Sequence, residues 1–273
     1  MTPCLIDGNS LYARSYWAAV AHGGDLSITT AELFFRTLLI TITERRQKLP
    51  LPVTHLLVCW DGRAKRDKQR VPKPDGYEEL RAWVEHAVNT VCGPGTSYKS
   101  ESEADDAIAT VVHGLYPRPD VPEIYVVSGD KDLQQLVCDK VRYFCLNEKS
   151  ILPHRLILGK WNVKHPSQIA IALAILGDSA DKIDGIKGWG PKKVAKLFEA
   201  FTADTPLVEI AESIAAQVPP DKLGVFIESL ELTALQTDLA GVPDPSPVLP
   251  CSVPELEALG LISLRFDVSS LAL

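Results

Sequence analysis

Three short apolar runs of this chain end in aspartate. Asp7 follows Leu-Ile, Asp61 follows Val-Cys-Trp, and Asp130 follows Val-Val-Ser-Gly. If these runs are neighbouring parallel strands, their carboxyl ends share one edge of the sheet, which is where ligands bind in open sheets of this kind. A single aspartate after a strand is usually a turn or helix-cap residue. Three of them in register make capping alone an insufficient explanation.

A second group of acids lies in Glu-Ser-Glu-Ala-Asp-Asp at residues 101–106. Ser102 can cap the helix that follows, and acids in a first turn complement the helix dipole, so capping is the simpler interpretation of this group. Glu103 and Asp106, however, are three residues apart and share a helix face, where like charges repel each other. A cation between them accounts for this placement, whereas capping does not.

Two further close pairs of aspartates occur in Gly-Asp-Lys-Asp at 129–132 and Gly-Asp-Ser-Ala-Asp at 177–181. Oxygen ligands without matching histidines favour Mg²⁺ or Mn²⁺ over zinc. We therefore predict a two-metal centre, in which ions ~4 Å apart activate an attacking water and stabilise the leaving oxygen of an in-line phosphoryl displacement. The candidate ligands are Asp7, Asp61, Glu103, Asp105, Asp106, Asp130, Asp132, Asp178 and Asp181.

A glycine-rich turn at residues 185–193, Gly-Ile-Lys-Gly-Trp-Gly-Pro-Lys-Lys, opens a helical pattern. Pro191 suits the first helical position, and the free amides at a helix start bind anions. With the apolar helix expected at 169–176, the turn predicts a helix-hairpin-helix that grips a nucleic-acid backbone without reading bases. An ordinary helix-start turn is the alternative, and the nearby Asp178 and Asp181 favour the hairpin. The candidate contacts are Gly185, Lys187, Gly188, Gly190, Lys192, Lys193 and Lys196.

A second basic stretch follows Asp61 at residues 63–70, with Lys73 just beyond it. Such charge runs are usually solvated faces. This one begins beside a candidate metal ligand, which favours a role in steering phosphate. Its candidate residues are Lys65, Arg66, Lys68 and Arg70.

The elements that must position these residues alternate between strands and helices, which predicts an α/β fold with a mainly parallel sheet. We expect an α/β core at 1–160 and a helix-hairpin-helix lobe with a C-terminal helical region at 161–273; the proline-rich end, 242–250, is expected to be loop. The predicted strands are Cys4–Ile6, Thr54–Trp60, Glu123–Val127 and Val141–Leu146. The predicted helices include Thr30–Lys48, Gly76–Val91, Ser102–Leu115 and Ile169–Leu176.

Composition sets few limits on function. A net charge of −7 argues at first against a nucleic-acid partner. Bound cations would offset the nine acids of the predicted centre, and the basic residues are clustered, so net charge decides little. The six cysteines lack Cys-x-x-Cys spacing and are expected to be buried thiols rather than zinc ligands or disulfides. With no signal-peptide pattern and no apolar run of membrane length, we expect a cytoplasmic protein without a membrane partner. We also expect a monomer.

The order of these motifs resembles the flap endonuclease or 5′-nuclease family. It is most similar to the bacterial and phage branch, which includes the N-terminal nuclease domain of DNA polymerase I and stand-alone phage 5′-exonucleases. The resemblance covers about residues 4–240 and extends to Leu-Thr-Ala-Leu-Gln-Thr-Asp-Leu at 232–239. It implies a PIN-like core and cleavage of DNA that carries a 5′ flap or a free 5′ end, in replication or repair. The products would end in 5′-phosphate and 3′-hydroxyl. At this length no polymerase domain is expected.

The resemblance also implies roles for individual residues. The first metal would be held by Asp7, Asp61, Glu103, Asp105 and Asp106, and the second would lie near Asp130, Asp132, Asp178 and Asp181. Arg14 stands where the family often places a phosphate-contacting arginine. Potassium would bind backbone carbonyls around Ile183, Ile186 and Trp189 in the hairpin.

This chain departs from the family in the segment after Asp61, which is short and lacks the Tyr-Lys pair of the arch that admits the 5′ end. Any of the four basic residues at 65–70 can replace that lysine. Two rival functions remain. A PIN-type ribonuclease shares the acidic core, but the chain length and the glycine-rich hairpin suit duplex DNA. An inactive DNA-binding scaffold would have lost ligands, and none of the nine is missing.

Overall fold

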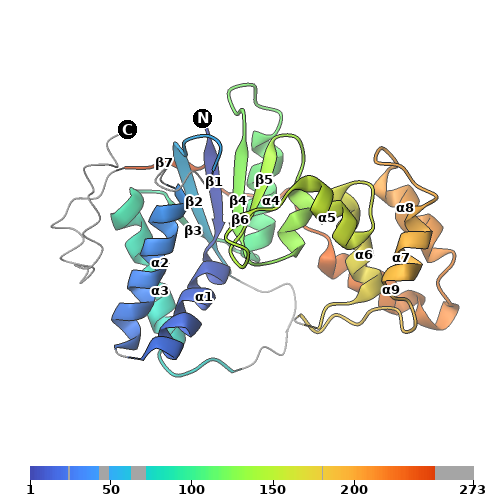
Figure 1. The fold of residues 1–273 in the computed structure, drawn as a ribbon, viewed down its shortest axis with the longest axis horizontal. Coiled ribbons are helices and arrows are strands. Elements are labelled where there is room, and N and C mark those ends of the chain that lie inside the picture. Colours follow the sequence, from blue (N-terminus) through green and yellow to red (C-terminus); the bar gives the residue numbers. More distant parts are fainter. Residues whose placement is uncertain (24, 43–48, 63–71, 180, 250–273) are drawn as a thin grey trace.

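The computed structural model describes residues 1–273 except 24, 43–48, 63–71, 180 and 250–273. A mixed, mostly parallel sheet forms the centre of the core, in the order β3-β2-β1-β4-β5-β6, with β7 paired to β2 (Figure 1). The strands are β1 (Pro3–Asp7), β2 (His55–Trp60), β3 (Ser97–Lys99), β4 (Ile124–Ser128), β5 (Val141–Cys145), β6 (Ser150–Ile151) and β7 (Ser246–Pro247). Only the β5–β6 and β2–β7 pairs of the described sheet are antiparallel.

Helices cover both faces of this sheet and build a lobe beside it. In the core they are α1 (Gly8–His22), α2 (Leu26–Ile42), α3 (Tyr77–Cys92) and α4 (Ala104–Leu115), with the 3₁₀ turn η2 (Asp132–Leu136). The chain then continues through α5 (His154–Trp161), η3 (Pro166–Gln168), α6 (Ile169–Leu176), α7 (Pro191–Phe198), α8 (Leu207–Ala215), η4 (Pro220–Lys222) and α9 (Leu223–Thr233).

The strands are apolar on both sides because both faces of the sheet are covered. Cys4 and Ile6 of β1 pack in one buried cluster with side chains from α1, α2 and α3. Leu5, which points to the opposite face, belongs to a second cluster with α4. This arrangement leaves the carboxyl ends of the strands as the open edge of the core.

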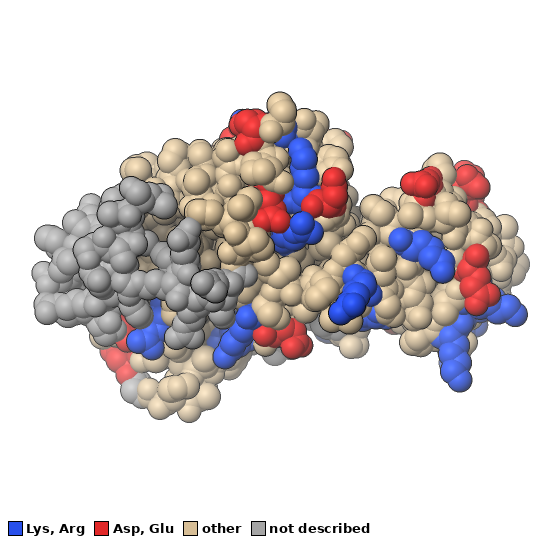
Figure 2. Space-filling view, turned by 45° about the horizontal axis from the view of Figure 1, so that its top comes forward, with Lys and Arg blue, Asp and Glu red and all other residues tan. Residues whose placement is uncertain are grey.

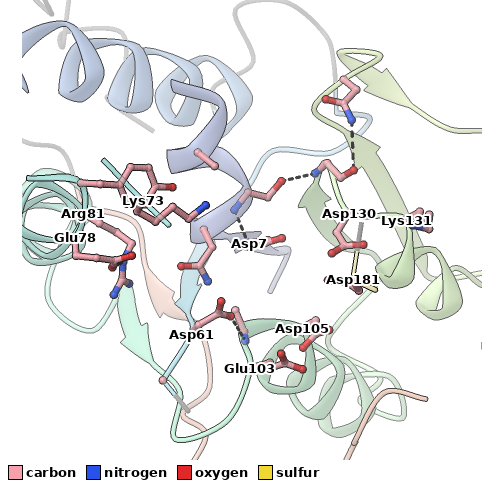
Figure 3. Close-up of a pocket in the computed structure, with 18 of the residues that line it drawn as sticks. Asp7, Asp61, Lys73, Glu78, Arg81, Glu103, Asp105, Asp130, Lys131 and Asp181 are labelled. Carbon is pink, nitrogen blue, oxygen red and sulfur yellow. Dashed lines mark hydrogen bonds and ion pairs between the residues drawn. The ribbon is translucent and has the colours of Figure 1, made fainter. Parts of the chain in front are cut away.

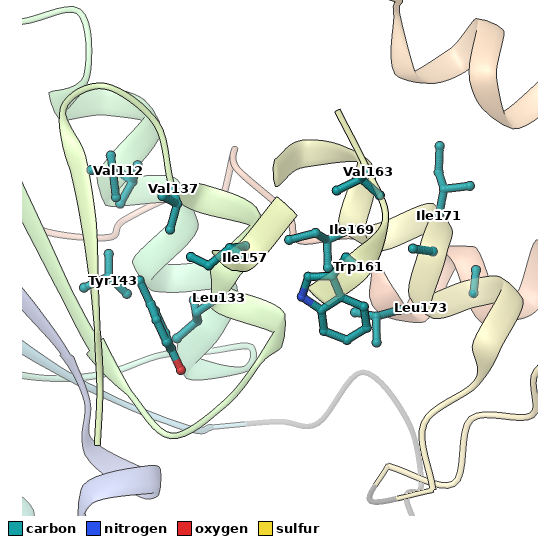
Figure 4. Close-up of a cluster of buried hydrophobic side chains, with 14 of the residues drawn as sticks. Val112, Leu133, Val137, Tyr143, Ile157, Trp161, Val163, Ile169, Ile171 and Leu173 are labelled. Carbon is teal, nitrogen blue, oxygen red and sulfur yellow. The ribbon is translucent and has the colours of Figure 1, made fainter. Parts of the chain in front are cut away.

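The second cluster continues from the core into the lobe. Leu133 and Ile157 on the core side and Trp161 and Leu173 on the lobe side belong to the same set of buried side chains (Figure 4). Trp161 also donates a 2.8 Å hydrogen bond from Nε1 to Gln134 Oε1. The predicted division after residue 160 falls at the end of α5 and stays a prediction.

The α/β class and the four predicted strands are confirmed, with end shifts of one residue. Helix α2 begins four residues earlier than predicted because Asp25 Oδ1 accepts hydrogen bonds from Ser27 N and Ile28 N and so starts the helix. The prediction that 242–250 is entirely loop is wrong, since it contains β7. Pro247 is tolerated there because a short edge strand does not need every N–H group.

Two further expectations concern the surface and the cysteines. The prediction of buried free thiols is confirmed for Cys4, Cys59, Cys92 and Cys145; Cys138 is also a free thiol but is only partly buried, and Cys251 lies outside the described residues. On the face drawn in Figure 2, basic and acidic side chains are interspersed over core and lobe. No helix within the described ranges combines the length and apolar character needed to cross a membrane.

Candidate active site

The three strand-end aspartates lie side by side because β1 is paired in parallel with both β2 and β4. Asp7 caps α1, accepting a 2.9 Å hydrogen bond from Ser10 N at Oδ1. Asp61 Oδ1 likewise accepts 2.9 Å from Ala104 N at the start of α4. Asp7 and Asp61 therefore bond to amides at helix starts and also converge with Asp130. The helix starts hold these carboxylates at the open edge of the sheet.

An open cleft of about 830 Å³ lies at this edge. Six of the nine predicted ligands line it, and Figure 3 shows them around one central space. They are Asp7, Asp61, Glu103, Asp105, Asp130 and Asp181. The other three stand immediately behind them. One carboxylate oxygen from each of Glu103, Asp105 and Asp106 lies within 4.8 Å of the others, and the same holds for Asp132, Asp178 and Asp181.

Burial and mutual repulsion raise the pKa of several of these carboxyl groups. Burial raises the pKa of Asp7 to about 7, and the charges of Asp130 and Asp61 add to the rise. Burial, followed by the charge of Asp130, raises the pKa of Asp132 to about 8. The pKa of Asp130 is raised as well, first by burial. Such clusters of perturbed carboxyl groups in a cleft are typical of functional sites.

The residues fit divalent cations that bind hard oxygen ligands. Asp132 is only 6% exposed, and its Oδ1 makes no hydrogen bond with any described residue. A buried carboxylate oxygen without a partner is costly unless a cation compensates it. Both groups of carboxylates consist of Asp and Glu alone, the ligand chemistry of Mg²⁺ and Mn²⁺.

Lys131 is a functional candidate that the sequence analysis did not single out. It lies between two predicted ligands in the chain, lines the cleft and forms an ion pair with Asp178. Burial opposes its charge, but the hydrogen bond and charge of Asp178 outweigh burial and raise the pKa of Lys131. The pair ties the edge of the core to the second residue beyond α6.

Two glycine contacts set where the carboxylates lie. A Cβ on Gly62 would sit 1.9 Å from Ser100 O, so only glycine lets the chain after Asp61 pass this close to the loop before α4. In the lobe, a Cβ on Gly177 would sit 2.4 Å from Gly185 N. This close crossing lets Asp178 and Ile183 exchange two backbone hydrogen bonds of 2.8 Å, which close the turn that carries Asp178 and Asp181.

Basic side chains flank the carboxylates. Lys73, Arg81 and Lys160 line the cleft, and Figure 3 shows Lys73 and Arg81 on one side of it. Arg81 Nε contacts Glu78 Oε2 at 2.8 Å, while Lys160 Nζ lies 4.9 Å from the centre of the Trp161 ring. Neither Arg81 nor Lys160 was predicted from the sequence, because each belongs to a helix whose placement at the cleft depends on tertiary packing.

Arg14 lies beside the cleft and donates a 3.1 Å hydrogen bond from Nη1 to Asn147 Oδ1 of the cleft wall. Asn9 also lines the cleft, and its buried Nδ2 has no hydrogen-bond partner among the described residues. The predicted arch residues Lys65, Arg66, Lys68 and Arg70 lie outside the described residues.

The glycine-rich turn joins α6 to α7, as predicted. Gly188 has a φ of 87°, which favours glycine, and Gly190 precedes Pro191 at the helix start. Ile183 O and Ile186 O, two of the predicted potassium ligands, each accept one backbone hydrogen bond, from Asp178 N and Trp189 N. The basic residues of the turn, Lys187, Lys192, Lys193 and Lys196, lie outside the carboxylate cleft.

Comparisons with known proteins agree with this geometry. Residues 2–162 match the family described as 5′-3′ exonuclease, N-terminal resolvase-like domain. The chain is 29% identical over 254 residues to DNA polymerase I of Bacillus subtilis, covering 86% of this chain but only 28% of that protein. It is 25% identical to the 5′-3′ exonuclease of Aquifex aeolicus and 29% identical to the flap endonuclease Xni of Shewanella frigidimarina, covering 86% and 78% of this chain and 82% of each relative.

Solved structures share the fold. The bacteriophage T5 flap endonuclease, in a pseudo-enzyme-product complex with DNA and metal ions, matches with a TM-score of 0.64 at 18% identity. That match covers 100% of this chain and 99% of the other. The catalytic core of Rad2 in complex with DNA substrate matches with a TM-score of 0.53 at 14% identity, covering 94% and 85%. The resemblance seen in the motifs is confirmed, and this chain belongs to the 5′-3′ exonuclease family through its N-terminal resolvase-like domain.

Proposed function

We propose that this protein is a metal-dependent, structure-specific 5′-nuclease. It hydrolyses DNA phosphodiesters as a 5′-flap endonuclease and a 5′→3′ exonuclease in replication or repair. The observation that carries the proposal is the cleft at the carboxyl edge of the sheet, where six of the nine candidate metal ligands surround one space. The family match and relatives described as 5′-3′ exonuclease and flap endonuclease support the reaction type.

Two divalent ions, Mg²⁺ or Mn²⁺, are the proposed cofactors. Asp7, Asp61 and the acids at 103–106 would hold one, and Asp130, Asp132, Asp178 and Asp181 the other. When bound, such ions supply an activated water and charge stabilisation at the leaving oxygen. The protein keeps these carboxylates close together through the caps of α1 and α4 and through the Asp178–Ile183 turn.

The basic and amide groups around the cleft position the substrate strand. The cleft that the carboxylates line is also lined by Lys73, Arg81 and Lys160. A phosphate group bound by these basic side chains would therefore lie next to the proposed metal ligands. Asn9 also lines this cleft, and its buried Nδ2 group, which has no partner among the described residues, is a further proposed donor. Arg14, held by Asn147, would contact a neighbouring phosphate at the β5 side.

The helix-hairpin-helix binds the duplex away from the reacting phosphate. At the start of α7, Pro191 has no N–H group, and Lys193 N and Val194 N donate to Gly190 O. The Lys192 amide and the lysine side chains of this turn are therefore the proposed phosphate contacts, which need no base readout. We also assign potassium to the carbonyls of Ile183, Ile186 and Trp189, because carbonyl oxygens that already accept one hydrogen bond retain a second lone pair. The four basic residues at 65–70 remain our candidates for guiding the 5′ end. The protein is proposed to act as a cytoplasmic monomer.

A labelled 5′-flap DNA duplex tests this function. Incubation with Mg²⁺ is expected to release short products with a 3′-hydroxyl, and chelation of the metal is expected to stop release. Asp130→Asn is expected to abolish cleavage while duplex binding persists. The matched control is Asp221→Asn, a change at an acid of the lobe outside the cleft, which should cleave like the wild type.

The same assay separates the rival functions. Preferential cleavage of single-stranded RNA over the flap substrate would replace the proposal with a PIN-type ribonuclease. Binding of the flap duplex without cleavage in Mg²⁺ and Mn²⁺ would replace it with a DNA-binding scaffold. Replacing K⁺ by Na⁺ should weaken duplex binding but not the cleavage of bound DNA if the hairpin carbonyls hold potassium.

A further inference from the structure

The chain returns from the lobe to the core after α9, through residues 234–249, which we call the return segment. In Figure 1 this segment runs from α9 to β7, which pairs with β2. Val248 N and Leu249 N donate to Thr54 O and Cys92 O, at 3.2 and 2.9 Å. Arg118 Nη1 contacts Asp244 Oδ2 at 3.0 Å. The return segment is therefore docked along the core rather than free of it.

Near its beginning the return segment contacts a candidate metal ligand. Gln236 N donates a 2.8 Å hydrogen bond to Oδ1 of Asp106, whose side chain is fully buried. Ser102 Oγ donates to the other oxygen, Oδ2, at 3.3 Å. The side chain of Gln236 is exposed, so the main-chain N–H group is what contacts the carboxylate.

A second bond joins the same region to the other group of acids. Gln135 Nε2 donates 2.8 Å to Thr233 O, the last residue of α9. Gln135 lies in η2, three residues after Asp132. The end of α9 and the start of the return segment thus contact elements of both carboxylate groups.

We propose that the return segment is a positioning element of the metal centre: the Gln236 amide orients the Asp106 carboxylate, so that metal binding and docking of the segment stabilise each other. An N–H donor to a carboxylate that faces a metal site fixes its orientation, and loss of such a partner weakens metal binding. Coupling of this kind is reciprocal, so bound metal also favours the docked segment. The inference rests on the proposed metal-dependent function.

The Gln236→Pro variant tests the amide directly, since proline has no N–H group. Gln236→Ala keeps the amide and changes only the exposed side chain. Leu239→Pro is the matched control, because Leu239 N donates to Thr110 Oγ1 on the same helix at 3.2 Å, and Thr110 is not a candidate ligand. Mn²⁺ binding is measured by calorimetry on the full chain without DNA, and thermal unfolding is measured alongside.

Gln236→Pro is expected to weaken Mn²⁺ binding about 10- to 100-fold, whereas Gln236→Ala binds like the wild type. Leu239→Pro, which removes a docking bond but leaves the bond to Asp106, is expected to weaken Mn²⁺ binding much less than Gln236→Pro. Equal weakening by both proline variants would overturn the specific role of Gln236. Hydrogen exchange of the wild type gives an independent measurement if a proline variant does not fold: Mg²⁺ should slow exchange at 234–239, and unchanged exchange would overturn the coupling. Wild-type protein that binds no Mn²⁺ would instead refute the proposed function itself.

Discussion

The hydroxyl of Ser128 donates a 2.7 Å hydrogen bond to Asp7 Oδ2 and accepts one of 2.8 Å from Asp130 N. One small side chain at the end of β4 therefore links the carboxylate at the end of β1 to the turn that carries Asp130. Ser128 itself is fully buried. The spacing of these two candidate ligands depends on it.

Ser128→Ala is expected to weaken metal binding. The hydrogen bond from Ser128 lowers the pKa of Asp7 against the larger effect of burial, so its removal raises that pKa and loosens the carboxylate. We expect roughly tenfold weaker Mn²⁺ binding, measured by calorimetry. Ser15→Ala is the control, because Ser15 is buried and, among the described residues, its Oγ bonds only Leu11 O, away from the candidate ligands. Equal affinity in the two variants would contradict the role of Ser128.

Metal binding is expected to strengthen as pH rises from 6 to 8.5. Asp7 and Asp132, with pKa values of about 7 and about 8 in the metal-free protein, must lose their protons to bind a cation. Protonation of Asp7 alone predicts at least about tenfold weaker Mn²⁺ binding at pH 6. Calorimetry in buffers of different ionisation enthalpy would also detect the released protons. Affinity that is independent of pH would contradict the raised pKa values.

The same titrations affect the stability of the metal-free protein. Folding raises the pKa of the Asp7 carboxyl group from 3.8, so the folded state binds its proton more tightly than the unfolded state does. The resulting contribution to the free energy of unfolding is at its full size below pH 3.8. This contribution is lost as pH rises through the folded pKa. In the presence of a chelator, the melting temperature of Asp7→Asn minus that of the wild type should therefore increase between pH 4 and pH 8. Excess Mg²⁺ should reverse this order at pH 8, because only the wild type retains the ligand.

Lys131→Met is expected to destabilise the metal-free protein. It leaves Asp178, which is only 5% exposed, without its ion-pair partner beside other carboxylates. The loss should be roughly 1–3 kcal/mol in urea unfolding with chelator. In the Asp178→Asn background the same change should cost less, since the buried Asp178 charge that Lys131 compensates is then absent. Similar losses in both backgrounds would show that the ion pair contributes little.

Gly62→Ala is expected to damage the site, because the new Cβ would lie 1.9 Å from Ser100 O. The clash would push the backbone at residues 61 and 62 away from the loop before α4 and so displace the Asp61 carboxylate. Mn²⁺ affinity and flap cleavage should both fall by an order of magnitude or more. Gly114→Ala is the control. Gly114 lies in α4 with open space around it, so alanine there should stabilise the protein by about 0.5–1 kcal/mol without changing cleavage.

Lys160→Ala is expected to weaken binding of flap DNA through a lost phosphate contact. The slope of log affinity against log salt should become shallower by about one unit. Lys164→Ala is matched to it, because Lys164 is also exposed near α5 but does not line the cleft. The pair is measured by fluorescence anisotropy in Ca²⁺, a cation used to limit cleavage. Identical slopes would remove Lys160 from the interface.

The arrangement of the strand-end acids followed from sequence for a physical reason. Parallel strands present their carboxyl ends at one edge, so Asp7, Asp61 and Asp130 had to converge once their runs were recognised as neighbouring strands. The helix at 169–176 and the turn after it were equally local, because apolar content, glycine and proline determine them within a few residues.

Other features depend on pairs of residues far apart in the chain. The Lys131–Asp178 ion pair spans 47 residues, and the Gln236–Asp106 bond spans 130. No local pattern predicts such contacts, because each exists only after the lobe has packed on the core and the return segment has docked. The same packing brings Arg81 and Lys160 to the cleft. The sequence by itself determined the acidic chemistry of the site, while tertiary packing decided which groups orient and surround it.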